Sequence, residues 1–144
     1  MAAAVHLRAR QGALEIRTKH STIDSVTAVD REAERQLVYA IRTARPDDAA
    51  LGEEETNITG SSGVCWILDP LDGTTNFVHG YPAYAVSVGV EIDGQRVIGV
   101  VHDTYHDRVY SDIVGLGAPC DGRPISVRAE SALSQALVGT GFFP

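Results

Sequence analysis

The chain has 144 residues, 44% of them hydrophobic, which suits one compact domain with a buried core. Its formal net charge is −7, and the excess of acid lies late in the sequence: residues 1–50 hold eight bases and seven acids, whereas residues 51–144 hold four bases and twelve acids. This acidic balance argues against a protein that holds nucleic acid through non-specific phosphate contacts. A phosphate substrate fits only where cations screen the carboxylates.

Cysteine usage and hydropathy favour a reducing compartment. Cys65 and Cys120 form no C-x-x-C pattern, so we expect neither a zinc site nor a redox pair, and we interpret both as buried free thiols. No apolar run approaches the ~20 residues of a membrane span, and residues 1–10 lack the apolar centre of a signal peptide. We therefore expect a cytoplasmic protein without membrane association.

The first thirty residues predict a helix and a loop. Residues 2–16 are rich in alanine and predict a first helix, which Gly12 interrupts. The helix runs into an extended segment over 14–18. Residues 19–30 cluster Ser, Thr and Asp, and they predict a loop.

A second helix is predicted from Asp30 to about Ala44. Apolar residues recur at helical spacing on one face (Ala33, Leu37, Val38 and Ile41), and charged residues occupy the others (Arg31, Glu32, Glu34 and Arg35). Either Thr27 or Asp30 begins the helix, and Pro46 prevents its continuation. Taken alone, Asp30 is interpreted as an N-terminal acid that interacts with the helix dipole.

Residues 52–63 predict irregular structure. Gly52 is followed by three glutamates, Glu53 to Glu55, which on composition alone indicate a solvated acidic loop. Residues 56–63 are rich in Gly, Ser and Thr, and they predict an exposed linker.

The most informative stretch is 66–79, with the sequence WILDPLDGTTNFVH. Its apolar start predicts the end of a buried strand that delivers Asp69 at its carboxyl end. Pro70 lacks a backbone N–H, so the strand ladder is predicted to stop there.

A turn with two carboxylates follows. Asp72 and Gly73 turn the chain, and residues 74–76 are predicted to cap a helical turn. Asp69 and Asp72 then lie three residues apart on a stiff turn, and Mg²⁺ prefers such oxygen ligands together with substrate phosphate. The alternative is that a D-x-x-D stretch after a strand is only a turn.

An antiparallel meander is predicted next. Residues 84–92 alternate strongly, and Asp-Gly pairs at 93–94 and 121–122 are hairpin signals. The predicted strands cover 84–92, 96–103, 108–111, 118–120 and 123–127. Together with the helices they predict an α+β fold, in which two helices pack on a largely antiparallel sheet.

Two units are predicted along the chain. Residues 1–130 are interpreted as a metal- and phosphate-binding domain. Residues 131–144 are interpreted as the start of a second domain that is cut short, with a helical turn at 131–135 and an apolar strand at 136–142. Such a strand without a neighbour would be an unpaired edge, which favours association.

Three blocks of sequence resemble the inositol monophosphatase family, the Mg²⁺-dependent, lithium-sensitive sugar phosphatases. In order, they are K-x-S-T-x-D-x-V-T-x-x-D at 19–30, G-E-E at 52–54 and W-I-L-D-P-L-D-G-T-T-N-F at 66–77. The resemblance covers residues 18–141. It implies the N-terminal half of a layered αβαβα sugar-phosphatase fold.

The resemblance also implies roles for individual residues. As metal ligands it implies Glu53, Asp69, the Leu71 carbonyl and Asp72, with Mg²⁺ as cofactor. As catalytic residues it implies Glu53, and Asp30 paired with the Thr74 hydroxyl to orient water. As substrate contacts it implies Glu53, Leu71, Asp72, Gly73 and Thr74, with the Gly73 and Thr74 N–H groups on the phosphate.

The leading functional hypothesis is a Mg²⁺-dependent phosphomonoesterase acting on a small polyol phosphate such as inositol 1-phosphate. Histidinol phosphate, fructose 1,6-bisphosphate and nucleotide 3′-phosphates remain alternative substrates. A non-catalytic metal- or partner-binding module is the second hypothesis, and an acidic Ca²⁺-binding domain the third. As protein partner we expect either a second copy of the chain or a missing C-terminal half.

Overall fold

The computed structural model describes residues 2–10, 16–18, 25–128 and 132–139. Its helices are α1 (Ala2–Arg10), α2 (Ala28–Ala44) and the short α3 (Thr74–Val78). Its strands are β1 (Ile16–Thr18), β2 (Ser25–Thr27), β3 (Ala49–Gly52), β4 (Asn57–Ile58), β5 (Val64–Asp72), β6 (Ala85–Ile92), β7 (Gln95–Asp103), β8 (Arg108–Ile113), β9 (Pro119–Cys120) and β10 (Arg123–Pro124).

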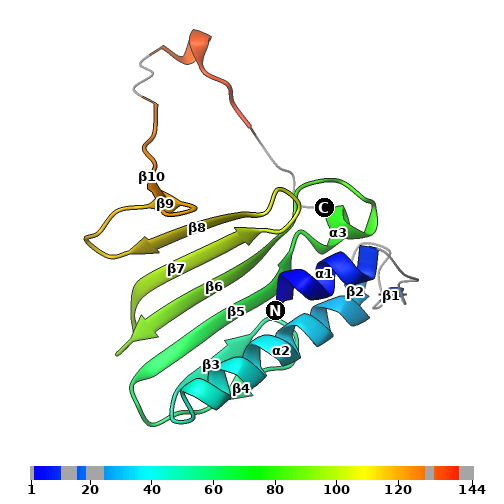
Figure 1. Ribbon diagram of the computed structural model, residues 1–144, viewed down its shortest axis with the longest axis vertical. Helices are drawn as coiled ribbons and strands as arrows, with labels where there is room; N and C mark the ends of the chain where they lie inside the picture. The colour runs from blue at the N-terminus through cyan, green and yellow to red at the C-terminus, as the bar shows by residue number, and fades with distance from the viewer. Residues whose placement is uncertain (1, 11–15, 19–24, 129–131, 140–144) are drawn as a thin grey trace.

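An eight-stranded sheet forms the centre of the fold, in the order β10-β9-β8-β7-β6-β5-β3-β4. All its neighbouring strands are antiparallel except β3 and β5, which run parallel. α1 and α2 lie side by side on one face of this sheet (Figure 1). The expected α+β class, with two helices on a largely antiparallel sheet, is confirmed.

The core lies between the two helices and the central strands. Its buried residues come from α1, α2, the end of β5, α3 and β6: Ala2, Val5, Val29, Ala33, Leu71, Phe77, Tyr84 and Val86. The Phe77 and Tyr84 rings meet edge to face, with centroids 4.9 Å apart. This geometry fixes α3 against the start of β6.

α2 ends at Ala44, as Pro46 predicts, and it begins at Ala28. Leu37 packs partly buried against the core. The placement of Glu34 on a polar face was wrong, because Glu34 is buried with a relative exposure of 3%. Its carboxylate is satisfied by hydrogen bonds from a neighbouring loop, which hydropathy periodicity does not register.

Three short strands were not predicted. β2 forms within the expected loop and pairs with β1 in an antiparallel ladder, whereas residues 19–24 of that loop lie outside the described residues. β3 pairs with β5, and β4 pairs with β3 across the acidic loop. Strands of two to four residues are too short to show an alternating pattern, and β3 is paired on both sides.

The predicted hairpin turns are confirmed, but the last strand is shorter than the predicted 123–127, because β10 ends at Pro124. β6 and β7 join through Asp93 and Gly94, whose φ angles are 50° and 79°. β9 and β10 join through Asp121 and Gly122 in the same way, with φ angles of 49° and 75°. Two successive residues with positive φ match the twist of the adjoining strands.

The C-terminal segment departs from the prediction. A 3₁₀ turn at Leu133–Gln135 agrees with the expected helical turn. Residues 136–139 are not in a strand, which contradicts that part of the predicted strand, and residues 140–142 lie outside the described residues. In Figure 1 residues 125–128 and 132–139 extend away from the sheet, and Leu137 is fully exposed.

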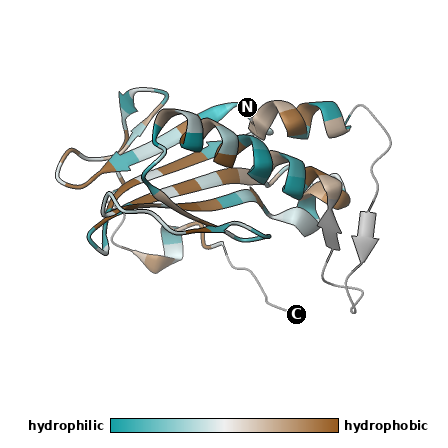
Figure 2. Ribbon diagram, turned by 90° about the horizontal axis from the view of Figure 1, so that it is seen from below, coloured by the Kyte–Doolittle hydropathy of each residue, from teal (hydrophilic) through white to brown (hydrophobic). Residues whose placement is uncertain are grey.

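The two faces of the sheet differ. Paired residues share a face, so Leu68, Val88 and Val100 lie on one face of the sheet, and Val88 packs against the core. α1 and α2 lie together on one side of the sheet in Figure 2. The opposite face carries Gly89 directly across from Gly99. A Cβ added at Gly99 would meet no heavy atom within 4 Å, and one at Gly89 would meet only the Ile67 Cβ, at 3.7 Å.

Two further expectations concern thiols and membranes. Cys65 and Cys120 are both free thiols, and both are half-buried rather than fully buried. Within the described ranges, the structure contains no helix long and apolar enough to cross a membrane.

Candidate metal and phosphate site

A β-bulge brings Asp69 and Asp72 to the same face of the sheet. On β6 their partners are Ser87 and Ala85, which are two residues apart and therefore share a face. On β5 the two aspartates are three residues apart, so β5 contains one extra residue between them. A regular strand would place two residues at this spacing on opposite faces.

Pro70 lies in this bulge and not at the end of the strand. The prediction that the ladder stops at Pro70 was therefore wrong, because β5 continues to Asp72 with a shifted register. The bulge tolerates a proline since the extra residue does not contribute a ladder hydrogen bond. The shift also turns Leu71 toward the helices, where it is buried in the core.

Glu53 approaches the same carboxylates from the loop that follows β3. The Glu53 N–H donates to the Leu68 carbonyl at 3.1 Å, one residue before Asp69. Burial and the Glu53 carboxylate, with a smaller contribution from Asp72, raise the pKa of Asp69 to about 7. Leu71 N–H donates to Asp69 Oδ1 at 3.1 Å and opposes this rise. Negative charge is therefore crowded at this point.

The carboxylates of Glu53, Asp69 and Asp72 are not gathered closely enough to form a complete metal site. Among the residues that the structure describes, no three or more His, Cys, Asp or Glu side chains are close enough together to hold a metal ion. The donor set nevertheless suits a hard cation, because carboxylates and a backbone carbonyl are the oxygen ligands that Mg²⁺ takes. The raised pKa of Asp69 means that burial and the neighbouring carboxylates disfavour its ionised form. A bound cation would stabilise that form.

An open cavity of about 870 Å³ lies beside Glu53 and Asp69. Its walls include Leu51, Ile67 and Ser87, which belong to the face opposite α1 and α2. The carboxylates therefore stand at the margin of a hollow that is large enough for a small ligand.

The turn after Asp72 depends on a glycine and on one side-chain hydrogen bond. Gly73 has a φ of 84°, and a Cβ added there would lie 2.8 Å from the Ala83 carbonyl oxygen. The Thr74 hydroxyl donates to the Leu71 carbonyl at 2.9 Å. The predicted side-chain cap of α3 is therefore absent: Gly73 occupies the cap position, and no side chain of the described residues caps it.

Asp30 lies in the first turn of α2, with a relative exposure of 3%. α3 packs beside β2, the strand that leads directly into α2. Asp30 and Thr74 therefore belong to adjoining elements. The pairing of their side chains remains a prediction.

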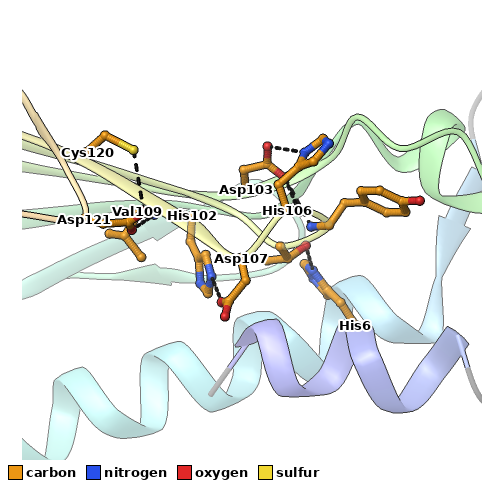
Figure 3. Close-up of polar contacts among 10 residues, drawn as sticks. His6, His102, Asp103, His106, Asp107, Val109, Cys120 and Asp121 are labelled. Atoms are coloured by element: carbon orange, nitrogen blue, oxygen red, sulfur yellow. Dashed lines mark hydrogen bonds and ion pairs between the residues drawn. The ribbon is translucent and has the colours of Figure 1, made fainter. Parts of the chain in front are cut away.

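Two buried residues near the candidate site were missed by the sequence interpretation. One is Glu34, which contacts the loop that follows Glu53. The other is His6 of α1, which contacts the Pro70 carbonyl at 3.0 Å and the Thr104 hydroxyl at 3.1 Å. Figure 3 shows His6 pointing from α1 toward the turn between β7 and β8. The only sequence feature that indicated burial of Glu34 or His6 was a polar residue at a helical position where an apolar residue is expected.

The family model that matches the chain is described as the inositol monophosphatase family, and it matches residues 1–143. The chain belongs to this family. It is 44% identical over 144 residues to the inositol-1-monophosphatase SuhB of Mycobacterium tuberculosis, an alignment that covers 94% of this chain and 50% of the relative. The chain spans about half the length of the curated relatives it matches.

Solved structures of the family share the fold. The extragenic suppressor protein SuhB of Bartonella henselae is 36% identical and superposes with a TM-score of 0.84, over 90% of this chain and 51% of that one. An IMPase/NADP phosphatase complexed with Mg²⁺ and phosphate is 28% identical, with a TM-score of 0.75, over 85% of this chain and 47% of that one. The expected inositol monophosphatase fold, present as about half of the family chain, is confirmed.

Proposed function

We propose that this chain provides the metal- and phosphate-binding part of a Mg²⁺-dependent phosphomonoesterase for small polyol phosphates, with inositol 1-phosphate as the leading candidate. The observation that carries this proposal is the bulge in β5, which aligns Asp69 and Asp72 on one face next to Glu53. Membership of the inositol monophosphatase family supports the same reaction.

The proposed metal ligands are Glu53, Asp69, the Leu71 carbonyl and Asp72. Bound Mg²⁺ would neutralise the phosphoryl oxygens and make a coordinated water more acidic. A relative crystallised with Mg²⁺ and phosphate supports this choice of cation. In the metal-free chain, burial and the neighbouring Glu53 carboxylate raise the pKa of Asp69 to about 7, and a bound cation would favour its ionised form.

The remaining roles fall on the turn and on α2. We assign the Gly73 and Thr74 N–H groups to the substrate phosphate, because these two residues start α3 directly after Asp72 and backbone N–H groups at a helix start bind phosphate. Asp30 and the Thr74 hydroxyl are assigned to the attacking water, which they would hold in line with the phosphorus. Glu53 completes this orientation from the loop that follows β3.

The test measures phosphate release from inositol 1-phosphate with and without Mg²⁺. Because the relatives are about twice as long, the chain is assayed both alone and mixed with the C-terminal half of a family member. We expect Mg²⁺-dependent release in the mixture and little release from the chain alone.

Two variants make this assay specific. Asp72→Asn should abolish the Mg²⁺-dependent release, whereas Asp47→Asn, which removes the same charge at an exposed position before β3, should not. Equal release by wild type and Asp72→Asn, or release that is independent of Mg²⁺, would refute the proposal.

A further inference from the structure

We infer that Glu34 is a positioning residue for the metal site: its carboxylate holds the loop that presents Glu53 to Asp69. This inference rests on the proposed function. It extends the site to a residue of α2 that is 19 positions from Glu53 in the sequence, and it assigns to that residue an effect on metal affinity.

The Glu34 carboxylate accepts four hydrogen bonds from consecutive residues of the loop. The Glu54 N–H donates to Oε2 at 3.0 Å, and the Glu55 N–H donates to Oε1 at 3.0 Å. Thr56 contributes two bonds to Oε1, one from its N–H at 2.9 Å and one from its hydroxyl at 2.7 Å. Charge-assisted bonds of this kind are stronger than those between neutral groups.

The loop begins against the sheet. The Gly52 N–H donates to the Thr56 carbonyl at 2.8 Å and closes the loop on itself. The Glu53 N–H donates to the Leu68 carbonyl at 3.1 Å, on β5. Glu53 is thus attached to β5 through its own N–H, and the residues directly after it are held by the Glu34 carboxylate.

Gly52 shows how closely Glu34 approaches this loop. A Cβ added at Gly52 would lie 2.4 Å from Glu34 Oε2 and 2.5 Å from its Cδ. The carboxylate therefore occupies the space that a side chain at position 52 would need. It cannot move aside without giving up its four hydrogen bonds.

Glu34 and Glu53 differ in how far their side chains are exposed, and this difference indicates different roles. Glu34 has a relative exposure of 3%, so it is fixed by its surroundings, whereas the Glu53 side chain is exposed. The backbone fixes the point from which an exposed side chain starts. The loop that Glu34 holds therefore sets which positions the Glu53 carboxylate can reach beside Asp69.

A purely structural role would give a different result from a positioning role. Loss of buried hydrogen bonds lowers stability wherever they are lost. Only a positioning role also weakens metal binding in molecules that are fully folded. Removing groups that orient metal ligands typically lowers metal affinity about 10- to 100-fold.

The experiment measures Mn²⁺ binding to the 144-residue chain by calorimetry, at a temperature where circular dichroism shows each variant to be folded. In Glu34→Gln an amide N–H₂ replaces one acceptor oxygen and faces backbone donors, so we expect about tenfold weaker Mn²⁺ binding. Hydrogen exchange of the Glu54, Glu55 and Thr56 amides should become faster in the same variant.

Two further substitutions keep the test sharp. Thr56→Val removes one of the four bonds and should weaken Mn²⁺ binding by a smaller factor than Glu34→Gln does. Thr56→Ser keeps the hydroxyl and should bind Mn²⁺ as tightly as the wild type. Asp48→Asn is the matched control. Asp48 is also a buried carboxylate, but it binds Arg45, Ser62 and Trp66 and not the Glu53 loop, so its loss should lower stability without changing Mn²⁺ affinity.

The outcomes distinguish this inference from the proposed function. Equal Mn²⁺ affinity in wild type, Glu34→Gln and Thr56→Val overturns the positioning role and leaves the metal site standing. A similar loss of affinity in Asp48→Asn also overturns it, because the effect would then follow stability alone. Absence of Mn²⁺ binding by the wild type overturns the proposed function and this inference together.

Discussion

His6 Nε2 donates a hydrogen bond to the Pro70 carbonyl oxygen at 3.0 Å. A carbonyl oxygen can only accept, so Nε2 carries a proton. Nδ1 lies 3.1 Å from the Thr104 hydroxyl and accepts from it when the imidazole is neutral. His6 therefore connects α1 to the bulge that aligns the aspartates. It also connects α1 to the turn after β7, toward which it points in Figure 3.

This contact predicts a specific acid sensitivity. Burial lowers the pKa of His6 to about 4, below its ordinary value of 6.5. Between these two pH values the unfolded chain binds more protons than the folded chain. The stability that neutral His6 contributes is therefore fully present above pH 6.5 and is lost as the pH falls toward 4. The shift corresponds to about 3 kcal/mol.

His6→Gln tests this sensitivity, because glutamine keeps a donor for Pro70 and does not titrate. Urea unfolding at pH 7, 6, 5 and 4 should show that the variant loses less stability than the wild type across this range. The comparison matters more than the absolute slope, since other buried acids also titrate at low pH. Parallel profiles for the two proteins would contradict the prediction.

Removal of the Asp69 charge should stabilise the metal-free chain. Its pKa in the folded state is raised to about 7, so the folded chain binds more protons between about pH 4 and 7, and stability falls as the pH rises through this window. At pH 8 we expect Asp69→Asn to exceed the wild type by about 2 kcal/mol, after allowance for partial exposure. Chemical unfolding in EDTA measures this difference, and the exposed Asp47→Asn serves as charge-matched control.

The same substitution should have the opposite effect once a divalent cation is present. A ligand that binds the folded state raises its stability, so Mg²⁺ should raise the Tm of the wild type. It should leave the Tm of Asp69→Asn nearly unchanged. An equal Tm increase in both proteins would show that Mg²⁺ binds elsewhere.

Metal affinity should separate Asp69 from Asp30. Asp69 is assigned as a metal ligand, whereas Asp30 is assigned to the attacking water. We therefore expect Asp69→Asn to weaken Mn²⁺ binding strongly and Asp30→Asn to change it only slightly, as measured by calorimetry. Similar affinities in the two variants would argue against these assignments.

Gly73 and Gly80, which lie on either side of α3, form a matched pair for the turn. Both have positive φ, 84° and 72°, but a Cβ added at Gly73 meets the Ala83 carbonyl oxygen at 2.8 Å, whereas one at Gly80 meets nothing within 4 Å. Gly80→Ala should cost about 1 kcal/mol from backbone strain alone. Gly73→Ala should cost more and should also weaken Mn²⁺ binding. Thermal unfolding and calorimetry check both expectations, and equal costs would refute the steric argument.

Much of the fold followed from local patterns. The end of α2 was set by Pro46, and the β6–β7 hairpin by Asp93 and Gly94, because these residues restrict their own backbone. β3 was missed, since four residues that pair with β5 carry no periodic signal of their own. Its position depends on a partner strand later in the chain.

The chemistry of the site was easier to anticipate than its support. Asp69 and Asp72 stand in a recognisable stretch, but Pro70 suggested the end of a strand where the structure has a bulge. Whether a proline terminates a strand or sits in a bulge depends on the register of β6, which the residues around Pro70 do not encode. Glu34 and His6 were missed for a related reason: each is a polar group buried by partners distant in the sequence.

The pairing of Gly89 with Gly99 has a consequence for engineering this chain. Because a side chain at Gly99 meets nothing, alanine or a β-branched residue there should be accepted by the isolated chain, with a gain of up to about 1 kcal/mol from strand propensity. A library selected only for the stability of these 144 residues would therefore fill both positions with larger side chains. In a larger assembly that packs a layer against this face, the larger side chains would occupy the space that this layer needs. The selected sequences would then fail to assemble.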